Sequence, residues 1–113
     1  MKMKAVMAFL AVGNLALLSS SVFAVDADAA QALAKKEGCL KCHAIDKKKD
    51  ASSMRDIGKK YAGKAEAQAR LEQHLLSGEK VKLEDGTQEE HKIIKTKDKG
   101  ELANLVAWIL SLK

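Results

Sequence analysis

Cys39-Leu40-Lys41-Cys42-His43 is the stretch of the sequence that carries the most chemical information. Its two cysteines are three positions apart, and a histidine follows the second one directly. Two thiols at this spacing can each form a thioether bond to one vinyl group of a haem, and the imidazole that follows can bind the iron. The pattern therefore predicts one haem c, attached covalently through Cys39 and Cys42, with His43 as the proximal iron ligand.

Other uses of a Cys-x-x-Cys pair fit the surrounding sequence poorly. A structural disulfide between Cys39 and Cys42 would close a loop too short to stabilise the chain much. A thioredoxin-like redox pair needs a preceding β-strand, whereas this motif follows a segment rich in alanine and lysine. A zinc finger needs a second ligand pair at close spacing, and His74 and His91 are 17 positions apart. Haem attachment is therefore the interpretation that we adopt.

The first 24 residues have the pattern of a secretory signal peptide. Lys2 and Lys4 precede an apolar run over residues 5–18, and Val22-Phe23-Ala24 has the pattern of a cleavage site. The apolar run is too short to span a bilayer comfortably, although an uncleaved anchor is the alternative. We expect cleavage after Ala24, export to the periplasm, and a mature domain over residues 25–113.

Hydrophobic periodicity predicts an all-α fold of about four helices. We expect them from Asp26 or Asp28 to Glu37, from Met54 to Lys60, from about Lys64 to Ser77, and from a cap at Thr96 to the end of the stripe Leu102, Leu105, Val106, Ile109 and Leu112. The stretch 79–95 lacks this periodicity, and its Asp85-Gly86 pair indicates a short β-hairpin. The mature domain has one Trp, one Tyr and no Phe, so a porphyrin would add apolar core to a small domain.

Three further segments complete a family resemblance: His43-Ala44-Ile45-Asp46, Tyr61-Ala62-Gly63 and Leu105-Val106-Ala107-Trp108-Ile109-Leu110. Together with the haem motif, they make the whole mature sequence resemble the class I cytochrome c family, in particular its small bacterial members. The resemblance implies a small cytochrome c fold around one haem. It also implies transfer of single electrons between redox partners and no enzymatic activity. Nothing in the sequence requires a dimer, and we expect a monomer.

The sequence departs from the family pattern on both sides of the haem. Family members carry Gly-Pro shortly after the haem motif, where the backbone supports the proximal histidine, and this chain has Ala51-Ser52 there. The support of His43 is therefore expected to differ. The family's distal ligand is a methionine beside a proline, but the chain contains no proline and only Met54 remains after signal cleavage.

We predict His91 as the distal iron ligand, because it lies 17 residues before Trp108, close to the position of the family's methionine. Met54 is the alternative ligand, but it is expected to be a core residue. His74 is expected to be an exposed or packing residue. A second imidazole in place of methionine lowers the haem potential, so the expected carrier has a low potential. A haem-based sensor with an open or displaceable distal site is the alternative function.

Charge distribution bears on the partner of this protein. The formal net charge of +5 falls to +3 when Lys2 and Lys4 leave with the signal, and residues 35–64 alone hold ten Lys or Arg and four Asp or Glu. A generically solvated surface would explain this cluster. The functional interpretation is that basic residues around an exposed haem edge steer an acidic redox partner. The scarcity of aromatic residues and the expected export argue against nucleic-acid binding.

Overall fold

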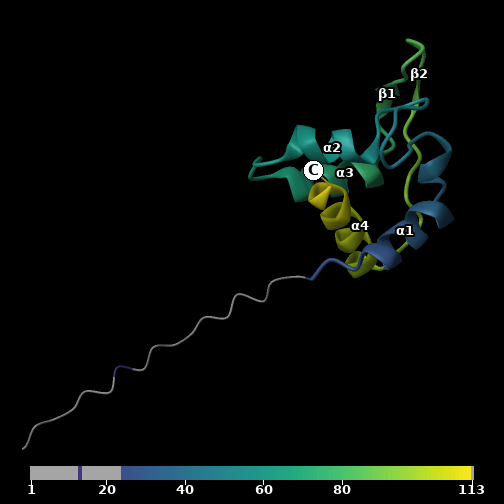
Figure 1. The fold of residues 1–113 in the computed structure, drawn as a ribbon. Coiled ribbons are helices and arrows are strands. Elements are labelled where there is room, and N and C mark those ends of the chain that lie inside the picture. Colours follow the sequence, from purple (N-terminus) through teal and green to yellow (C-terminus); the bar gives the residue numbers. More distant parts are fainter. Residues whose placement is uncertain (1–12, 14–23, 113) are drawn as a thin grey trace, which may run out of the picture.

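The computed structural model describes residues 13 and 24–112 of the chain. The predicted signal peptide therefore lies outside the described residues, apart from residues 13 and 24. In chain order the elements are α1 (Ala27–Lys36), a 3-10 turn η1 (Cys39–Lys41), α2 (Met54–Tyr61), α3 (Ala67–Ser77), β1 (Lys80–Lys82), β2 (Gln88–Glu90) and α4 (Lys99–Ser111) (Figure 1). The expected fold, about four helices with a short hairpin, is confirmed. Within the described ranges, no helix is long and apolar enough to cross a membrane.

The limits of α1 follow from residues at its two ends. The Asp26 side chain accepts a hydrogen bond from the Ala29 N–H at 3.0 Å, which caps the first turn. At the other end, Gly38 has a φ of +79°, a left-handed conformation that ends the helix at little cost only for glycine. This stop lets the chain turn directly into η1, which carries the two cysteines.

Two helices begin later than the sequence indicates. Helix α4 is capped by Asp98, whose carboxylate accepts hydrogen bonds from the N–H groups of Gly100 at 2.8 Å and Glu101 at 3.2 Å. The predicted cap at Thr96 is therefore wrong, because the Thr96 hydroxyl donates instead to the Glu101 side chain at 2.8 Å. Helix α3 begins at Ala67 rather than near Lys64, since a turn joins the Ala67 N–H to the Lys64 carbonyl at 3.2 Å.

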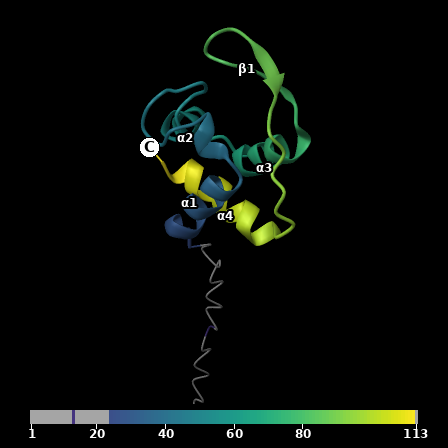
Figure 2. The ribbon, with the colours of Figure 1, turned by 90° about the vertical axis from the view of Figure 1, so that its right-hand side faces the viewer.

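Helix α4 is the centre of the core, and the other three helices pack around it (Figures 1 and 2). Its Leu105 and Val106 are fully buried, and Ala30 and Ala34 on α1 give a small-residue surface on which α4 packs. Asn104 locks the same pair of helices, because its side chain accepts from the Asp26 N–H at 2.9 Å and donates to the Asp26 carbonyl at 2.8 Å. The first and last helices of the domain are thus held side by side.

The contact between α2 and α4 depends on Gly58. A Cβ atom placed on Gly58 would collide with the carbonyl oxygens of Leu112 and Ile109. Both neighbours are backbone atoms at the end of α4, so they cannot turn aside as a side chain can. Only glycine lets α2 approach the end of α4 this closely.

The hairpin predicted from Asp85-Gly86 is present and reaches across to the loop that follows the haem motif. Strands β1 and β2 pair antiparallel, with Lys80 opposite Glu90 and Lys82 opposite Gln88. The Glu84 N–H, next to the turn, donates to the Asp50 carbonyl at 3.0 Å. The hairpin therefore connects the segment after α3 with the segment before α2, and it closes one side of the cavity described next.

Candidate haem site

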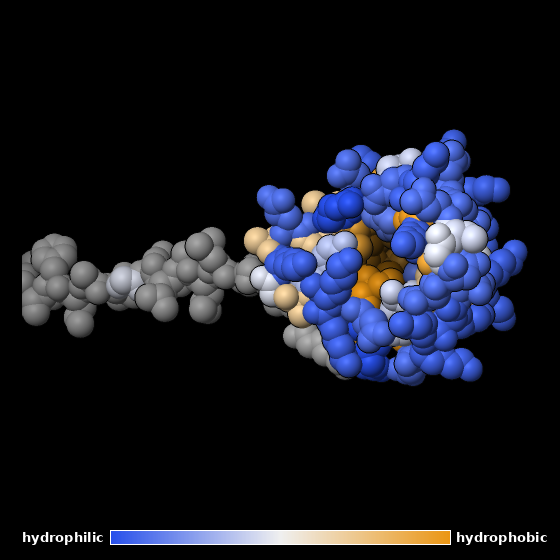
Figure 3. Space-filling model, turned by 90° about the horizontal axis from the view of Figure 1, so that it is seen from above, coloured by the Kyte–Doolittle hydropathy of each residue, from blue (hydrophilic) through white to orange (hydrophobic). Residues whose placement is uncertain are grey.

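A cavity of about 560 Å³ opens between the Cys39–His43 motif and the segment 91–94. Helices α2 and α3, the hairpin, and Leu105 and Ile109 of α4 complete its wall. Figure 3 looks into this hollow and shows hydrophobic residues inside it and hydrophilic residues around its mouth. A pocket of this size and lining is suited to a large, mostly apolar ligand.

Cys39 and Cys42 are free, half-buried thiols that line the cavity together. The 3-10 turn sets their spacing, since the N–H groups of Cys42 and His43 both donate to the Cys39 carbonyl, at 3.3 and 3.0 Å. Burial raises the pKa of the Cys39 thiol. The Cys39 backbone hydrogen bond and the positive charge of Lys92 lower that pKa, whereas the negative charge of Glu37 raises it further.

His43 is held by the loop in which the sequence lacks the family's Gly-Pro. Its Nδ1–H donates to the Ser52 carbonyl at 2.6 Å, and the Ala51 N–H fixes that loop by donating to the Cys42 carbonyl at 3.0 Å. The support of His43 is therefore the backbone carbonyl of Ser52, at the position where the family pattern has proline. This hydrogen bond uses a main-chain acceptor, which any residue type at position 52 could supply. With its proton on Nδ1, the neutral His43 ring has its lone pair on Nε2.

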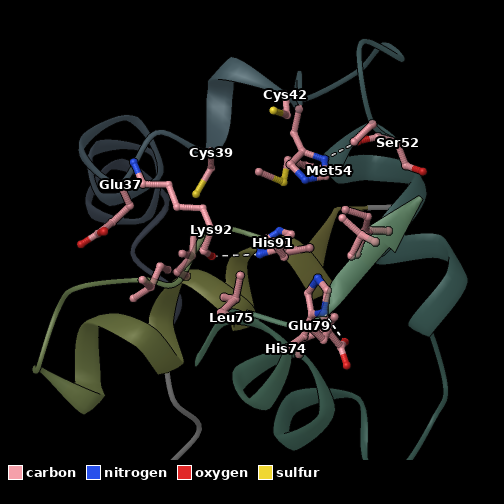
Figure 4. Close-up of a pocket in the computed structure, with 18 of the residues that line it drawn as sticks. Glu37, Cys39, Cys42, Ser52, Met54, His74, Leu75, Glu79, His91 and Lys92 are labelled. Atoms are coloured by element: carbon pink, nitrogen blue, oxygen red, sulfur yellow. Dashed lines mark hydrogen bonds and ion pairs between the residues drawn. The ribbon is translucent and has the colours of Figure 1, made fainter. Parts of the chain in front are cut away.

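His91 lies in the same cavity, with its ring centroid 6.4 Å from that of His43. Its Nδ1–H donates to the Lys92 carbonyl at 2.9 Å, which again leaves Nε2 free (Figure 4). A metal–imidazole bond is about 2 Å long and the centroid lies about 1 Å behind the nitrogen, so two imidazoles on opposite sides of one metal have centroids about 6 Å apart. The spacing of His43 and His91 thus suits one metal ion bound between them.

The surroundings of His91 favour its neutral form. Burial lowers the pKa of its imidazole, and any positive charge on the neighbouring His74 and His43 rings acts in the same direction. The hydrogen bond to the Lys92 carbonyl and the charge of Glu79 oppose this shift. A neutral imidazole with a free Nε2 is the form that binds a metal.

The backbone around His91 is fixed to the end of α3. The His91 N–H donates to the Glu79 carbonyl at 3.0 Å, and the Ile94 N–H donates to the Leu75 carbonyl at 3.0 Å. Gly78 allows this approach, because its φ is +64° and a Cβ atom there would meet the Ile93 side chain at 3.0 Å. The position of His91 is thus set by backbone contacts as well as by its side chain.

Met54 is buried, with 3% of its surface exposed, and it lines the cavity (Figure 4). Its backbone N–H donates to the Ala44 carbonyl at 2.9 Å, and it follows Ser52 by two residues. Met54 therefore starts from the side of the cavity that holds His43. Because it lies on the same side of the cavity as His43, this placement favours a packing role for Met54 over a role as the second iron ligand.

His74 lines the cavity too, which the sequence did not indicate. Its ring centroid lies 4.3 Å from that of His91, and its Nδ1–H donates to the Glu79 carboxylate at 2.5 Å. Arg70 also donates to this carboxylate, at 3.3 Å. The hydrogen bond from His74, followed by the charge of Arg70, lowers the pKa of Glu79, whereas desolvation acts the other way. The spacing of three residues between Leu71 and His74 on α3 was the one available signal for this inward position.

The sequence model of the family described as "Cytochrome c" matches residues 27–113 of the chain. The chain belongs to the cytochrome c family. Cytochrome c-551 of Pseudomonas aeruginosa is 38% identical over 78 residues, which cover 69% of this chain and 70% of that protein. Cytochrome c2 of Rhodocyclus tenuis is 37% identical over 83 residues, 73% of this chain and 90% of that protein.

Solved structures agree with this assignment. The class 1 cytochrome MtoD from Sideroxydans lithotrophicus ES-1 superposes with a TM-score of 0.76 at 52% identity, covering 79% of this chain and 98% of that one. Cytochrome c552 of Nitrosomonas europaea gives a TM-score of 0.60 at 30% identity and covers 78% of this chain and 100% of that one. The protein is thus a class I c-type cytochrome, a monohaem protein of electron transport whose haem c is attached through Cys39 and Cys42.

The chemical groups that line the cavity fit a covalently attached haem. It has two free thiols on one turn for the thioether bonds, and two imidazoles that each donate through Nδ1 to a backbone carbonyl, which in the neutral ring leaves the lone pair on Nε2. Its walls include the buried side chains Leu71, Leu75, Ile94, Leu105 and Ile109, which suit the apolar face of a porphyrin.

Proposed function

We propose that this cytochrome is a periplasmic one-electron carrier in which His43 and His91 are the two axial ligands of the haem iron. The observation that carries the proposal is the 6.4 Å separation of the two ring centroids together with the free Nε2 atom of each ring. Bound haem supplies an iron that changes reversibly between the ferric and ferrous states. The role of the protein is to attach it, to hold both imidazoles and to limit rearrangement when the charge changes.

The two ligands have different supports, and each support fixes a ring. His43 follows directly after the attachment turn and donates to the Ser52 carbonyl. His91 donates to the Lys92 carbonyl and packs against the His74 ring. Hydrogen bonds of this kind orient a ligand and raise its basicity. A second imidazole in place of a methionine makes the ferric state more stable, so we expect a potential below that of methionine-ligated relatives.

Basic residues near the haem motif support docking of an acidic redox partner. Lys41, Lys47, Lys48 and Lys49 are all exposed, and they flank His43 in the sequence. Lys48 is partly balanced by Glu84 at 3.5 Å, which brings the hairpin next to this basic loop. Positive charge around the attachment edge would orient an acidic partner and increase the rate of encounter. Such a contact would be transient and would weaken with salt.

Export supports the proposed location. Residues 1–24 have the pattern of a signal peptide that is cleaved after Ala24, which would deliver residues 25–113 to the periplasm. The N-terminal sequence of the purified holoprotein tests this directly. A start at Val25 supports the proposed cleavage, and a start at Met1 would contradict it.

A His91→Met variant tests the ligation. We expect its reduction potential to rise and a near-infrared band of iron–methionine bonding to appear. Ile93→Met is the matched control, because Ile93 is 52% exposed and lies in the same loop, so this variant adds a methionine without removing His91. The proposal predicts no change in the control. An unchanged spectrum and potential in His91→Met would refute it. If His91 is no ligand, the haem-based sensor with an open distal site becomes the better account.

A further inference from the structure

Glu37 joins the haem-attachment motif to the loop of the distal histidine. It is the residue that ends α1, two positions before Cys39, and only 6% of its surface is exposed. Its carboxylate accepts hydrogen bonds from the Lys95 N–H at 3.0 Å and the Thr96 N–H at 3.2 Å. These donors are 58 and 59 positions away in the chain. A single side chain therefore fixes the segment that follows His91 against the start of the haem motif.

The charge of Glu37 lacks a bonded cation among the described residues, where its hydrogen-bond donors are both backbone groups. Burying a carboxylate in this way is costly, but each of its two oxygens accepts one of these hydrogen bonds, so a neutral Gln side chain would keep only one of them. Lys92 lies nearby, since its Nζ is 2.8 Å from the position that a Cβ of Gly38 would take (Figure 4). The negative charge of Glu37 nevertheless affects the pKa of the Cys39 thiol more than the positive charge of Lys92 does.

We propose that the buried Glu37 carboxylate is a positioning residue that also lowers the reduction potential of the haem. It lines the same cavity as both cysteines and both proposed ligands. Oxidation adds one unit of positive charge to the haem site, and a fixed negative charge in a wall of low dielectric stabilises that state. Its two hydrogen bonds also restrain residues 95–96 and so limit movement of the loop that carries His91. The restraint of the loop matters only if His91 is a ligand, so this part of the inference rests on the proposed ligation. The effect of the Glu37 charge on the reduction potential requires only the bound haem.

Redox titration of the holoprotein with Glu37→Gln tests the charge. This variant keeps the size and one acceptor oxygen but removes the negative charge. Glu66→Gln is the matched control, because Glu66 is exposed and does not line the cavity. We expect the potential of Glu37→Gln to shift to more positive values, while the control stays at the wild-type value. Equal potentials in the two variants would overturn the proposal.

Hydrogen–deuterium exchange of the wild-type holoprotein tests, without any variant, whether Glu37 holds residues 95–96. The amides of Lys95 and Thr96 should exchange slowly, because the carboxylate of a buried residue holds both. Fast exchange at both positions would overturn the anchoring role, even if Glu37→Gln yields no holoprotein.

The tests of Glu37 can fail independently of the test of ligation by His91. A wild-type spectrum without two imidazoles would refute the role of His91 and leave the comparison of Glu37→Gln with Glu66→Gln intact. An intact two-imidazole spectrum with equal potentials would refute the role of Glu37 alone.

Discussion

The imidazole rings of His43 and His91 lie with their centroids 6.4 Å apart and their planes inclined by 45°. Each ring donates its Nδ1–H to a backbone carbonyl, of Ser52 and Lys92 respectively. The two rings are thus held in the same tautomer by independent parts of the chain. A spacing set in advance by the fold reduces the rearrangement that metal binding and electron transfer would otherwise require.

Acidification tests the environment of His91. Burial lowers the pKa of His91, so its neutral form persists to lower pH than in a free histidine. The stabilisation that depends on neutral His91 is then complete above the ordinary pKa of histidine and is lost as the pH falls through the lowered pKa. Iron competes with protons for the same imidazole nitrogen, so iron binding also shifts protonation of His91 to lower pH. In an acid titration of the ferric holoprotein, we expect the low-spin spectrum to persist below the ordinary pKa of histidine and to recover on neutralisation. Conversion to high spin at or above that pKa would contradict the assignment.

Met54 is expected to act through packing alone. A Met54→Leu variant conserves volume and should cost less than about 1.5 kcal/mol of unfolding free energy in denaturant titrations. Met54→Ala, which leaves a cavity beside the haem, should cost about 2–5 kcal/mol. The optical spectrum of ferric Met54→Leu should equal that of the wild type. A change to high spin in this variant would instead identify Met54 as a ligand.

Gly58 is the position at which the packing of α2 on α4 leaves no room. Gly58→Ala would place a methyl group against the carbonyl oxygens of Ile109 and Leu112. Because overpacking against backbone cannot be relieved by a rotamer change, we expect a loss at or above the usual range of about 1–3 kcal/mol. Lys59→Ala, at an exposed position on the same helix, is the control and should change stability little. Equal melting temperatures of the two variants would contradict the close approach.

The basic loop after the haem motif should govern reactions with charged partners. Oxidation of the ferrous protein by ferricyanide, an anion, should slow as salt is added, whereas oxidation by a cationic cobalt complex should not. In stopped-flow experiments at low salt, the double variant Lys47→Glu and Lys49→Glu should react with ferricyanide about ten times more slowly. The control reverses Lys97 and Lys99, which are exposed near the start of α4. An equal loss in the control would show that only net charge matters.

Local patterns in the sequence predicted the fold well. The Cys39–His43 motif, the apolar stripe of α4 and the turn at Asp85-Gly86 each act over a few residues, and each has the expected structure. The predicted cap of α4 at Thr96 was wrong, because Thr96 and Asp98 can both cap a helix and the structure uses Asp98, the stronger capping type of the two.

Contacts between distant parts of the chain could not be predicted in this way. The support of His43 comes from a backbone carbonyl, which leaves no trace in the identity of Ser52. The inward position of His74 depends on how α3 is rotated against α4. The hydrogen bonds of Glu37 join residues 58 and 59 positions apart, and they follow no periodic pattern.

The most direct test of the account is the electron paramagnetic resonance and near-infrared spectrum of the ferric wild-type holoprotein at neutral pH. Ligation by His43 and His91 predicts a low-spin signal typical of two imidazoles and no iron–methionine band. An iron–methionine band would contradict it and point to Met54, and a high-spin signal would contradict it in favour of an open distal site.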